Sequence, residues 1–201
     1  MEPPEYEKVL SFWFGELDEH GAPTAETSAR WFKKDAGFDQ TIRDRFQALH
    51  AAVHAGERED WLGSARGRLA YVIVLDQFSR NMYRDTPAMF ASDPRALAAA
   101  LAGIDAGDDR ELRAAERAFF YMPLMHSEDL AVQDRCVSVF TAWRDSVEGD
   151  ARKRAANSID YAEKHRVIVR RFGRFPHRNA ILGRPSTPEE LEFLSQPGSS
   201  F

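Results

Sequence analysis

The stretch FDQTIRDRFQALHAAV, residues 38–53, decides the fold class of this chain. Its large apolar side chains recur every three or four residues, at Phe38, Ile42, Phe46, Leu49 and Val53. That spacing places them on one face of an α-helix, whereas a half-buried strand would alternate apolar and polar residues. The stretch therefore predicts an amphipathic helix that buries one face.

Helical spacing recurs along the rest of the chain, and signals for a sheet do not. Apolar residues from Val132 to Val147 form a second stripe, and no Asn-Gly or Asp-Gly pair joins two alternating runs. We therefore expect an all-α fold of stacked antiparallel helical hairpins. The expected helices lie near residues 4–15, 27–33, 36–55, 65–84, 93–105, 109–121, 127–148, 151–172 and 187–195. Glycines suited to the left-handed residue after a helix are Gly56, Gly107, Gly149 and Gly173.

The composition is that of a globular protein, with 43% hydrophobic and 29% charged residues. No linker rich in Pro, Gly or Ser divides the chain, so we expect a single all-helical domain over residues 1–201 with a loose tail from about residue 195. One cysteine, Cys136, excludes an intramolecular disulfide framework. With no export signal or membrane span in the pattern, we expect a cytoplasmic protein. The net charge of −5 argues against a general nucleic-acid binder.

The aliphatic run LAYVIVL (69–75) turns abruptly polar in LDQFSRN (75–81). On a helix over residues 65–84, one face carries Asp76, Gln77, Arg80 and Asn81. One interpretation is a helix that reaches solvent near Asp76, where exposed ion pairs between residues four apart contribute little to the stability of the fold. The other is a central helix in which Asp76 holds Arg80 while Gln77 and Asn81 line a cleft.

The second polar cluster lies in YMPLMHSEDLAVQ, residues 121–133. Pro123 is expected to break one helix, and Ser127 to cap the next. His126 and Glu128 could instead face inward as an acid/base pair, or as two ligands of a metal. A zinc site needs at least three protein ligands, and no standard spacing supplies a third, so no metal site is predicted.

The third cluster, FGRFPHRN (172–179), lies within a segment from Lys164 to Arg184 that carries seven cations and no acid. It presents the candidate ligand-binding residues Arg174, His177, Arg178 and Asn179. These could form an anion-binding loop, because the planar guanidinium group suits carboxylate or phosphate. They could equally satisfy the carbonyl groups at a helix C-terminus.

Three other histidines have simpler interpretations. His50 and His54 are four residues apart but lie opposite the apolar face of their helix, so both are expected to be exposed and without function. His165 lies on an apolar stripe and is expected to be a hydrogen-bonded core histidine.

Five stretches carry a resemblance to a known family. They are VLSFWFGE (9–16), RWFKKDAGFD (30–39), LDQFSRNMYRDTP (75–87), FFYMPLMHSEDLAVQ (119–133) and GRFPHRNAILGRPSTPEELEFL (173–194). In this order they resemble domain of unknown function 924, an uncharacterised and mainly bacterial family. The resemblance implies stacked helices like the tetratricopeptide-repeat superhelix, with no known enzymatic activity, no established cofactor and no assigned catalytic residue.

The sequence leaves three functions open. The first is a binding protein for a small anionic ligand or an acidic peptide, held by Arg80, Arg174 and Arg178. Its aromatic lining would come from Trp13, Phe14, Trp31 or Tyr83. The second is a small hydrolase or phosphoesterase with His126 or His177 as general acid/base and Glu128 or Asp76 as the orienting carboxylate. The third is a scaffold for partner proteins, by analogy of fold. No cofactor, substrate or oligomeric state follows from the sequence.

Overall fold

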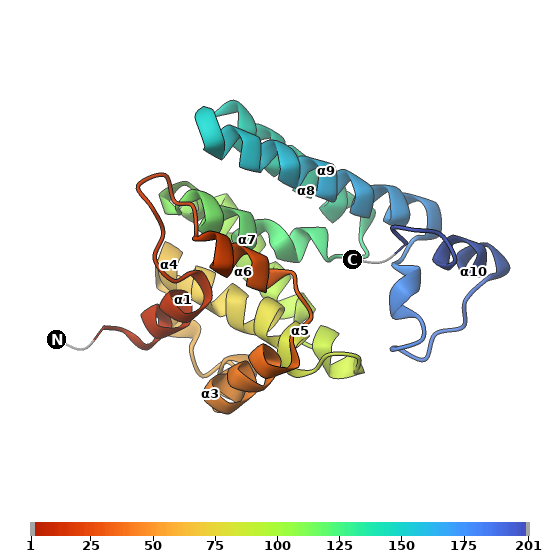
Figure 1. Ribbon diagram of the computed structural model, residues 1–201, viewed down its shortest axis with the longest axis horizontal. Helices are drawn as coiled ribbons and strands as arrows, with labels where there is room; N and C mark the ends of the chain where they lie inside the picture. The colour runs from red at the N-terminus through yellow and green to blue at the C-terminus, as the bar shows by residue number, and fades with distance from the viewer. Residues whose placement is uncertain (1–2, 200–201) are drawn as a thin grey trace.

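The computed structural model describes residues 3–199 and is built of helices joined by short connections (Figure 1). The α-helices are α1 (Glu5–Phe14), α2 (Ala25–Trp31), α3 (Ala36–Ala55), α4 (Ala65–Val72), α5 (Ser79–Met82), α6 (Asp93–Ala106), α7 (Ala114–Met125), α8 (Leu130–Asp145), α9 (Gly149–Phe172) and α10 (Pro188–Leu194). Residues 3–199 contain no β-strand, only an isolated bridge between Leu17 and Pro23. The all-α prediction is confirmed.

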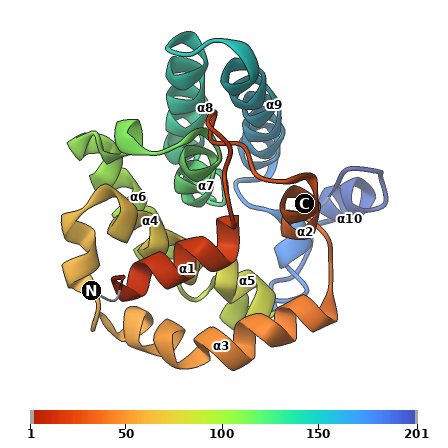
Figure 2. The same ribbon diagram turned by 60° about the vertical axis from the view of Figure 1, so that its left-hand side comes forward.

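The helices form two layers. Helices α8 and α9 are an antiparallel pair that lies over α7, and α1, α3, α4 and α5 lie on the other side of α7 (Figures 1 and 2). Helix α10 lies beyond the end of α9 (Figure 1). Within residues 3–199, no helix combines the length and apolar character needed to cross a bilayer. A tetratricopeptide-like superhelix stays a prediction.

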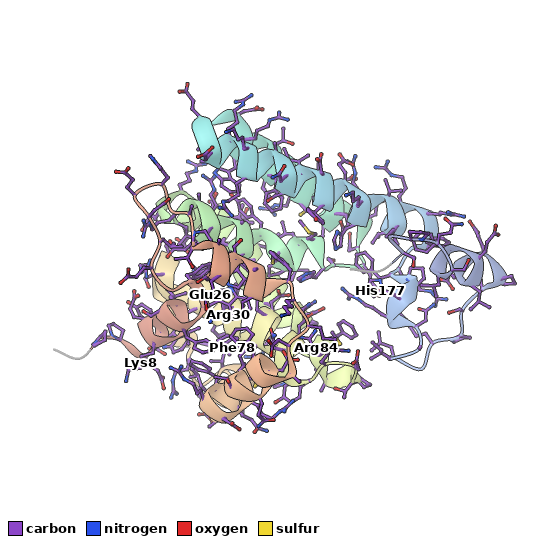
Figure 3. All side chains as sticks on the ribbon, in the orientation of Figure 1. Lys8, Glu26, Arg30, Phe78, Arg84 and His177 are labelled. Atoms are coloured by element: carbon purple, nitrogen blue, oxygen red, sulfur yellow. The ribbon has the colours of Figure 1, made fainter. Side chains whose placement is uncertain are left out.

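The core is rich in aromatic side chains. Phe78 is fully buried, and its ring lies 4.8 Å from that of Phe46, 5.8 Å from that of Trp13 and 6.0 Å from that of Phe12. Figure 3 shows Phe78 in the interior of the layer that contains α1 and α3. Burying one such side chain contributes about 1.5–3 kcal/mol, so these contacts join α1 and α3 to the centre of the fold. A second, smaller cluster contains Ile168, Val169 and Phe175.

Capping chemistry sets several helix ends. The Asp35 carboxylate accepts hydrogen bonds from the Gly37 and Phe38 amides at 2.9 and 3.0 Å and starts α3. Left-handed residues end three helices, at Gly56, Gly107 and Gly173. Gly149 has the predicted positive φ, 59°, but it does not end a helix, because α8 ends at Asp145 and Gly149 is the first residue of α9.

Two predicted helix ends near residue 125 are wrong. Pro123 lies inside α7, which continues to Met125, and the amide of His126 still bonds to the carbonyl of Met122 at 3.0 Å. Proline has no N–H group, so the helix lacks a single backbone hydrogen bond at Pro123. Because the helix continues past Pro123, Leu124 is completely buried. Helix α8 is capped by Asp129 rather than Ser127, through bonds from the Ala131 and Val132 amides.

The predicted helix over residues 65–84 is interrupted by a π-helical segment, Ile73–Phe78, between α4 and α5. All six of its side chains are buried, and it contains both Asp76 and Gln77. The Ser79 hydroxyl donates to the Leu75 carbonyl at 2.6 Å and satisfies one acceptor of the widened turn. Single π-helical turns occur often at functional sites, because the wider turn redirects side chains. This turn is what brings Asp76 beneath α7.

Candidate functional site

The Asp76 carboxylate is the centre of a buried polar network. It is 1% exposed and meets three donors: His126 Nδ1 at 2.7 Å, Arg80 Nη1 at 2.9 Å and Gln77 Nε2 at 2.5 Å. Burial alone would raise the pKa of Asp76, but Arg80 and His126 hold it well below its usual range. Of the two interpretations of LDQFSRN, the structure has the buried helix in which Asp76 holds Arg80, but neither Gln77 nor Asn81 borders the cleft described below.

Arg80 links this network to a residue that the sequence did not indicate. Its guanidinium group binds the carboxylate of Asp93 through two bonds of 2.9 and 3.0 Å, besides its contacts with Asp76. Asp93 is the first residue of α6, where the sequence suggested only a helix start. Arg80 is therefore shared between two carboxylates.

Arg178 brings the third polar cluster to the other two. Its Nη2 donates to the carbonyl of His126 at 2.8 Å, and its Nη1 lies 3.6 Å from Asp93 Oδ2. The guanidinium carbon lies 4.6 Å from the ring centre of Phe90 and 4.7 Å from that of Phe175. Burial lowers the pKa of Arg178 to about 10, and the charge of Arg80 acts in the same direction. The three polar clusters thus converge.

A cleft of about 430 Å³ opens at this point of convergence. Its polar lining comes from Asp93, His126, Ser127, Glu128 and Arg178. Its apolar lining comes from Pro87, Phe90, Ala91, Pro94, Leu97, Pro123 and Leu182. A mainly apolar wall with a few converging polar groups is the usual form of a small-molecule site.

His126 is held as a neutral imidazole with a defined tautomer. Burial and the charge of Arg80 lower its pKa, which the Asp76 carboxylate only partly offsets. An ionised carboxylate only accepts hydrogen bonds, so Nδ1 carries the ring proton. Nε2 is then a lone-pair acceptor on a residue that lines the cleft and whose side chain is 18% exposed, and no residue between 3 and 199 donates to it.

Glu128 has a different role from the predicted pairing with His126. Its carboxylate accepts the amide of Phe175 at 2.8 Å and both terminal nitrogens of Arg184 at 2.7 and 2.9 Å. Burial would raise the pKa of Glu128, but Arg184 and the Phe175 amide lower it overall. Glu128 therefore fastens the segment after α9 against the start of α8.

Arg174 and Asn179 lie outside the cleft. Both bind Glu190 of α10, Arg174 by bonds of 2.7 and 2.8 Å and Asn179 by one of 3.2 Å. Glu190 also accepts the Thr187 amide in a capping box, so the cluster fixes the start of α10.

Asn81 and the predicted aromatic lining are also elsewhere. Asn81 donates to Asp39, which Arg84 binds as well, and Figure 3 shows Arg84 near α5. The rings of Trp13, Phe14 and Trp31 lie in the core around Phe119. None of the residues predicted to supply the aromatic lining borders the cleft, where Phe90 supplies the ring instead.

The cation-rich segment is not an open positive surface. Each of its six arginines has a carboxylate within 2.6–3.6 Å: Arg166, Arg170, Arg171, Arg174, Arg178 and Arg184. The acids come mostly from α8, α10 and α6, so a charge count along the sequence alone could not reveal the compensation. Arg178 has the longest of these separations.

The remaining histidines differ in exposure: His20 and His54 are exposed, as predicted for His54, and the others are buried or partly buried. The prediction for His50 is wrong: it is buried and bonded to Ser79 at 2.7 Å, because this face of α3 contacts α5. His54 bonds to Ser92 at 2.9 Å. The core role of His165 is confirmed by its burial and its bond to the Tyr161 carbonyl at 2.8 Å. His177, on the segment after α9 in Figure 3, does not line the cleft.

Acidification from pH 6.5 toward pH 4 is expected to lower the free energy of unfolding. Burial lowers the pKa of His50 to about 4 and of His165 to about 3, from an ordinary value of 6.5. In this window the unfolded chain binds more protons, so each histidine contributes a slope of up to about 1.4 kcal/mol per pH unit. Urea unfolding of His50→Gln should give a flatter pH profile than the wild type. The matched control is the exposed His20→Gln; parallel profiles for the two variants would contradict the assignment.

Fold and site together define an all-helical protein with a buried Asp–Arg–His network beneath a half-apolar cleft. Within residues 3–199, no three His, Cys, Asp or Glu side chains converge as a metal site requires. The family model for a bacterial protein of unknown function, domain of unknown function 924, matches residues 9–198, and the chain belongs to this family.

A solved structure supports the same fold. The chain is similar to a protein of unknown function from Agrobacterium tumefaciens, with 38% sequence identity and a TM-score of 0.79. The similarity covers 94% of this chain and 96% of that one. A comparison with curated proteins gave no match.

Proposed function

We propose that the cleft binds a small molecule with an apolar body and one carboxylate or phosphate group, and that Arg178 is the cationic contact. The main support for this proposal is that the guanidinium group of Arg178 has few hydrogen-bond and ion-pair partners. Its side chain lines the cleft, donates one hydrogen bond to residues 3–199 and has its nearest carboxylate at 3.6 Å. Arg80, Arg174 and Arg184 each bind a carboxylate through both arms of the fork.

The local charges favour an anion beside Arg178. Asp93 is already bound by Arg80, and the positive charge of Arg80 disfavours the charged form of Arg178. A buried charge without a close partner is costly, and an anionic ligand would supply that partner. The stacking of Arg178 between Phe90 and Phe175 keeps its planar fork in place for such a ligand.

Equilibrium binding of apolar carboxylates, phosphate monoesters and acidic peptides tests this function. Arg178→Ala is expected to weaken the binding of the preferred ligand at least about tenfold, because a hydrogen bond to a charged group contributes about 1.5–3 kcal/mol. Arg178→Lys keeps the charge but loses the fork, and should retain only part of the affinity.

The matched control is Arg171→Ala, which removes an exposed arginine paired with Glu189 on the surface. It is expected to leave the affinity unchanged. Equal affinities of the wild type and a folded Arg178→Ala protein would remove Arg178 as the anchor. Preference for acidic peptides over small acids would identify a peptide as the occupant of the cleft.

A hydrolase is the second candidate, favoured by the 2.7 Å contact between His126 and Asp76. In this function Nε2 of His126 takes a proton from water as the water oxygen attacks an ester carbon or phosphorus. The proton then passes to the leaving oxygen. Asp76 orients the ring and stabilises the imidazolium, and Arg178 stabilises the developing negative charge.

The hydrolase function predicts a measurable loss in one variant. His126→Gln is expected to lower kcat/KM for a carboxylate or phosphate ester by about 10²–10⁴-fold, because general base catalysis contributes that much. The control variant is the exposed His20→Gln. Hydrolysis that persists unchanged in His126→Gln would exclude this role for His126.

A further inference from the structure

We infer that the ligand of the cleft carries a hydrogen-bond donor, a hydroxyl or amino group, next to its acidic group, and that this donor meets Nε2 of His126. The inference rests on the proposed function and specifies its ligand: a hydroxy acid or amino acid with an apolar side chain. It follows from the orientation of one imidazole ring and from the groups beside it.

The first step is the tautomer of His126. Arg80, Gln77 and His126 all donate to the Asp76 carboxylate, which is 1% exposed. With a guanidinium at 2.9 Å, this carboxylate stays ionised and accepts only. Its bond to His126 Nδ1 therefore fixes the ring proton on that nitrogen, and Nε2 offers a lone pair.

The second step is the position of the acidic group. Arg178 Nη2 donates to the backbone carbonyl of His126 at 2.8 Å, so the guanidinium group lies against the backbone of His126, and both residues line the cleft. A carboxylate bound to Arg178 has no proton to give to Nε2, and two facing lone pairs repel. A bare acid would thus displace water from Nε2 and leave a buried acceptor without a donor.

The third step is the balance of polar groups in the cleft. Besides Nε2, the acceptors in its lining are the carboxylates of Asp93 and Glu128, whereas the charged donor is Arg178. The hydroxyl of Ser127 accepts the Asp129 amide at 3.1 Å. Arg80 already binds Asp93 and Arg184 already binds Glu128. This leaves Nε2 of His126 as the acceptor for a donor on the ligand, and the apolar remainder of the lining suits a hydrocarbon side chain.

Three probes of one shape test the inference: 3-phenylpropanoic acid, 2-hydroxy-3-phenylpropanoic acid and phenylalanine. They share the ring and the carboxylate and differ in the donor. The wild-type protein is expected to bind the hydroxy acid, the amino acid or both at least about tenfold more tightly than the unsubstituted acid, because a site with a buried polar group rejects a ligand that leaves it unpaired. The ratio between hydroxy acid and amino acid identifies which donor is used.

His126→Leu removes the acceptor and is expected to bring the three affinities together, while the exposed His20→Leu keeps the wild-type ratio. Independently of affinity, ¹⁵N NMR of the folded wild-type protein should show His126 protonated at Nδ1 and unprotonated at Nε2. Binding of the preferred probe should shift the Nε2 resonance.

The outcomes are separable. Equal, Arg178-dependent binding of all three probes would overturn the inference and leave the proposed function standing. A proton on Nε2 in the NMR spectrum would overturn it whatever the affinities. If no probe loses affinity in Arg178→Ala, the proposed function fails and the inference falls with it.

Discussion

Asp76→Asn is expected to lower the free energy of unfolding by about 3 kcal/mol at pH 7, because removing one partner of a buried ion pair leaves charge uncompensated. The substitution keeps the shape of the side chain and removes its charge. Arg80 retains Asp93, which limits the loss, but His126 and Gln77 lose an ionised acceptor. Urea unfolding followed by circular dichroism gives the difference directly.

The control and the pH dependence make this prediction specific. Asp145→Asn breaks an exposed pair with Arg144 and should cost at most about 1 kcal/mol. Because the folded-state pKa of Asp76 is lowered, its contribution to stability is full above the unfolded-state value of 3.8 and is lost as pH falls below it. The wild type and Asp76→Asn should therefore converge in stability at low pH. A loss no larger than that of Asp145→Asn at pH 7 would contradict the central role of Asp76.

Phe78→Ala is expected to have the largest effect, a loss of about 4 kcal/mol in the free energy of unfolding. The side chain is fully buried, and its ring contacts the rings of Phe46, Trp13 and Phe12. Truncation removes apolar burial and leaves a cavity between α1, α3 and the π-helical segment. Thermal and urea unfolding of the purified variant measure the loss.

The same substitution at an exposed phenylalanine is the control. Phe32 is 74% exposed, although its ring stacks on Phe119 at 6.3 Å. Phe32→Ala is expected to change the free energy of unfolding by no more than about 0.5 kcal/mol. Similar losses in the two variants would contradict the assignment of Phe78 to the core.

Local signals in the sequence sufficed for some elements and failed for others. The helix over residues 36–55 was predicted with its observed bounds, because its apolar stripe, the Asp35 cap and Gly56 all agree. The π-helical segment was missed, because an aliphatic run such as LAYVIVL fits either a regular or a widened turn. The widened turn forms because the side chains of this segment are buried on all sides. That burial depends on helices that lie far away in the sequence.

The candidate site was predicted in part for the same reason. His126, Asp76 and Arg178 belong to predicted clusters, and their side chains meet in the structure. Asp93 was missed because its partner Arg80 is 13 residues away, which is no helical spacing. Arg174 was misplaced although a signal existed: Glu190, the glutamate of the capping box at the start of α10, binds Arg174.

The bond between Glu128 and Arg184 determines when the cleft can exist during synthesis. A nascent chain that has emerged only as far as Phe172 contains the Asp76 network but lacks both Arg178 and Leu182. These two residues reach the cleft only when the segment after Gly173 turns back onto the start of α8, where Glu128 holds it. The earlier helices can pack first, as domains generally fold from the N-terminal side on the ribosome. A chain that ends at Phe172 therefore lacks part of the cleft wall, and the residues up to Arg184 are needed to complete it.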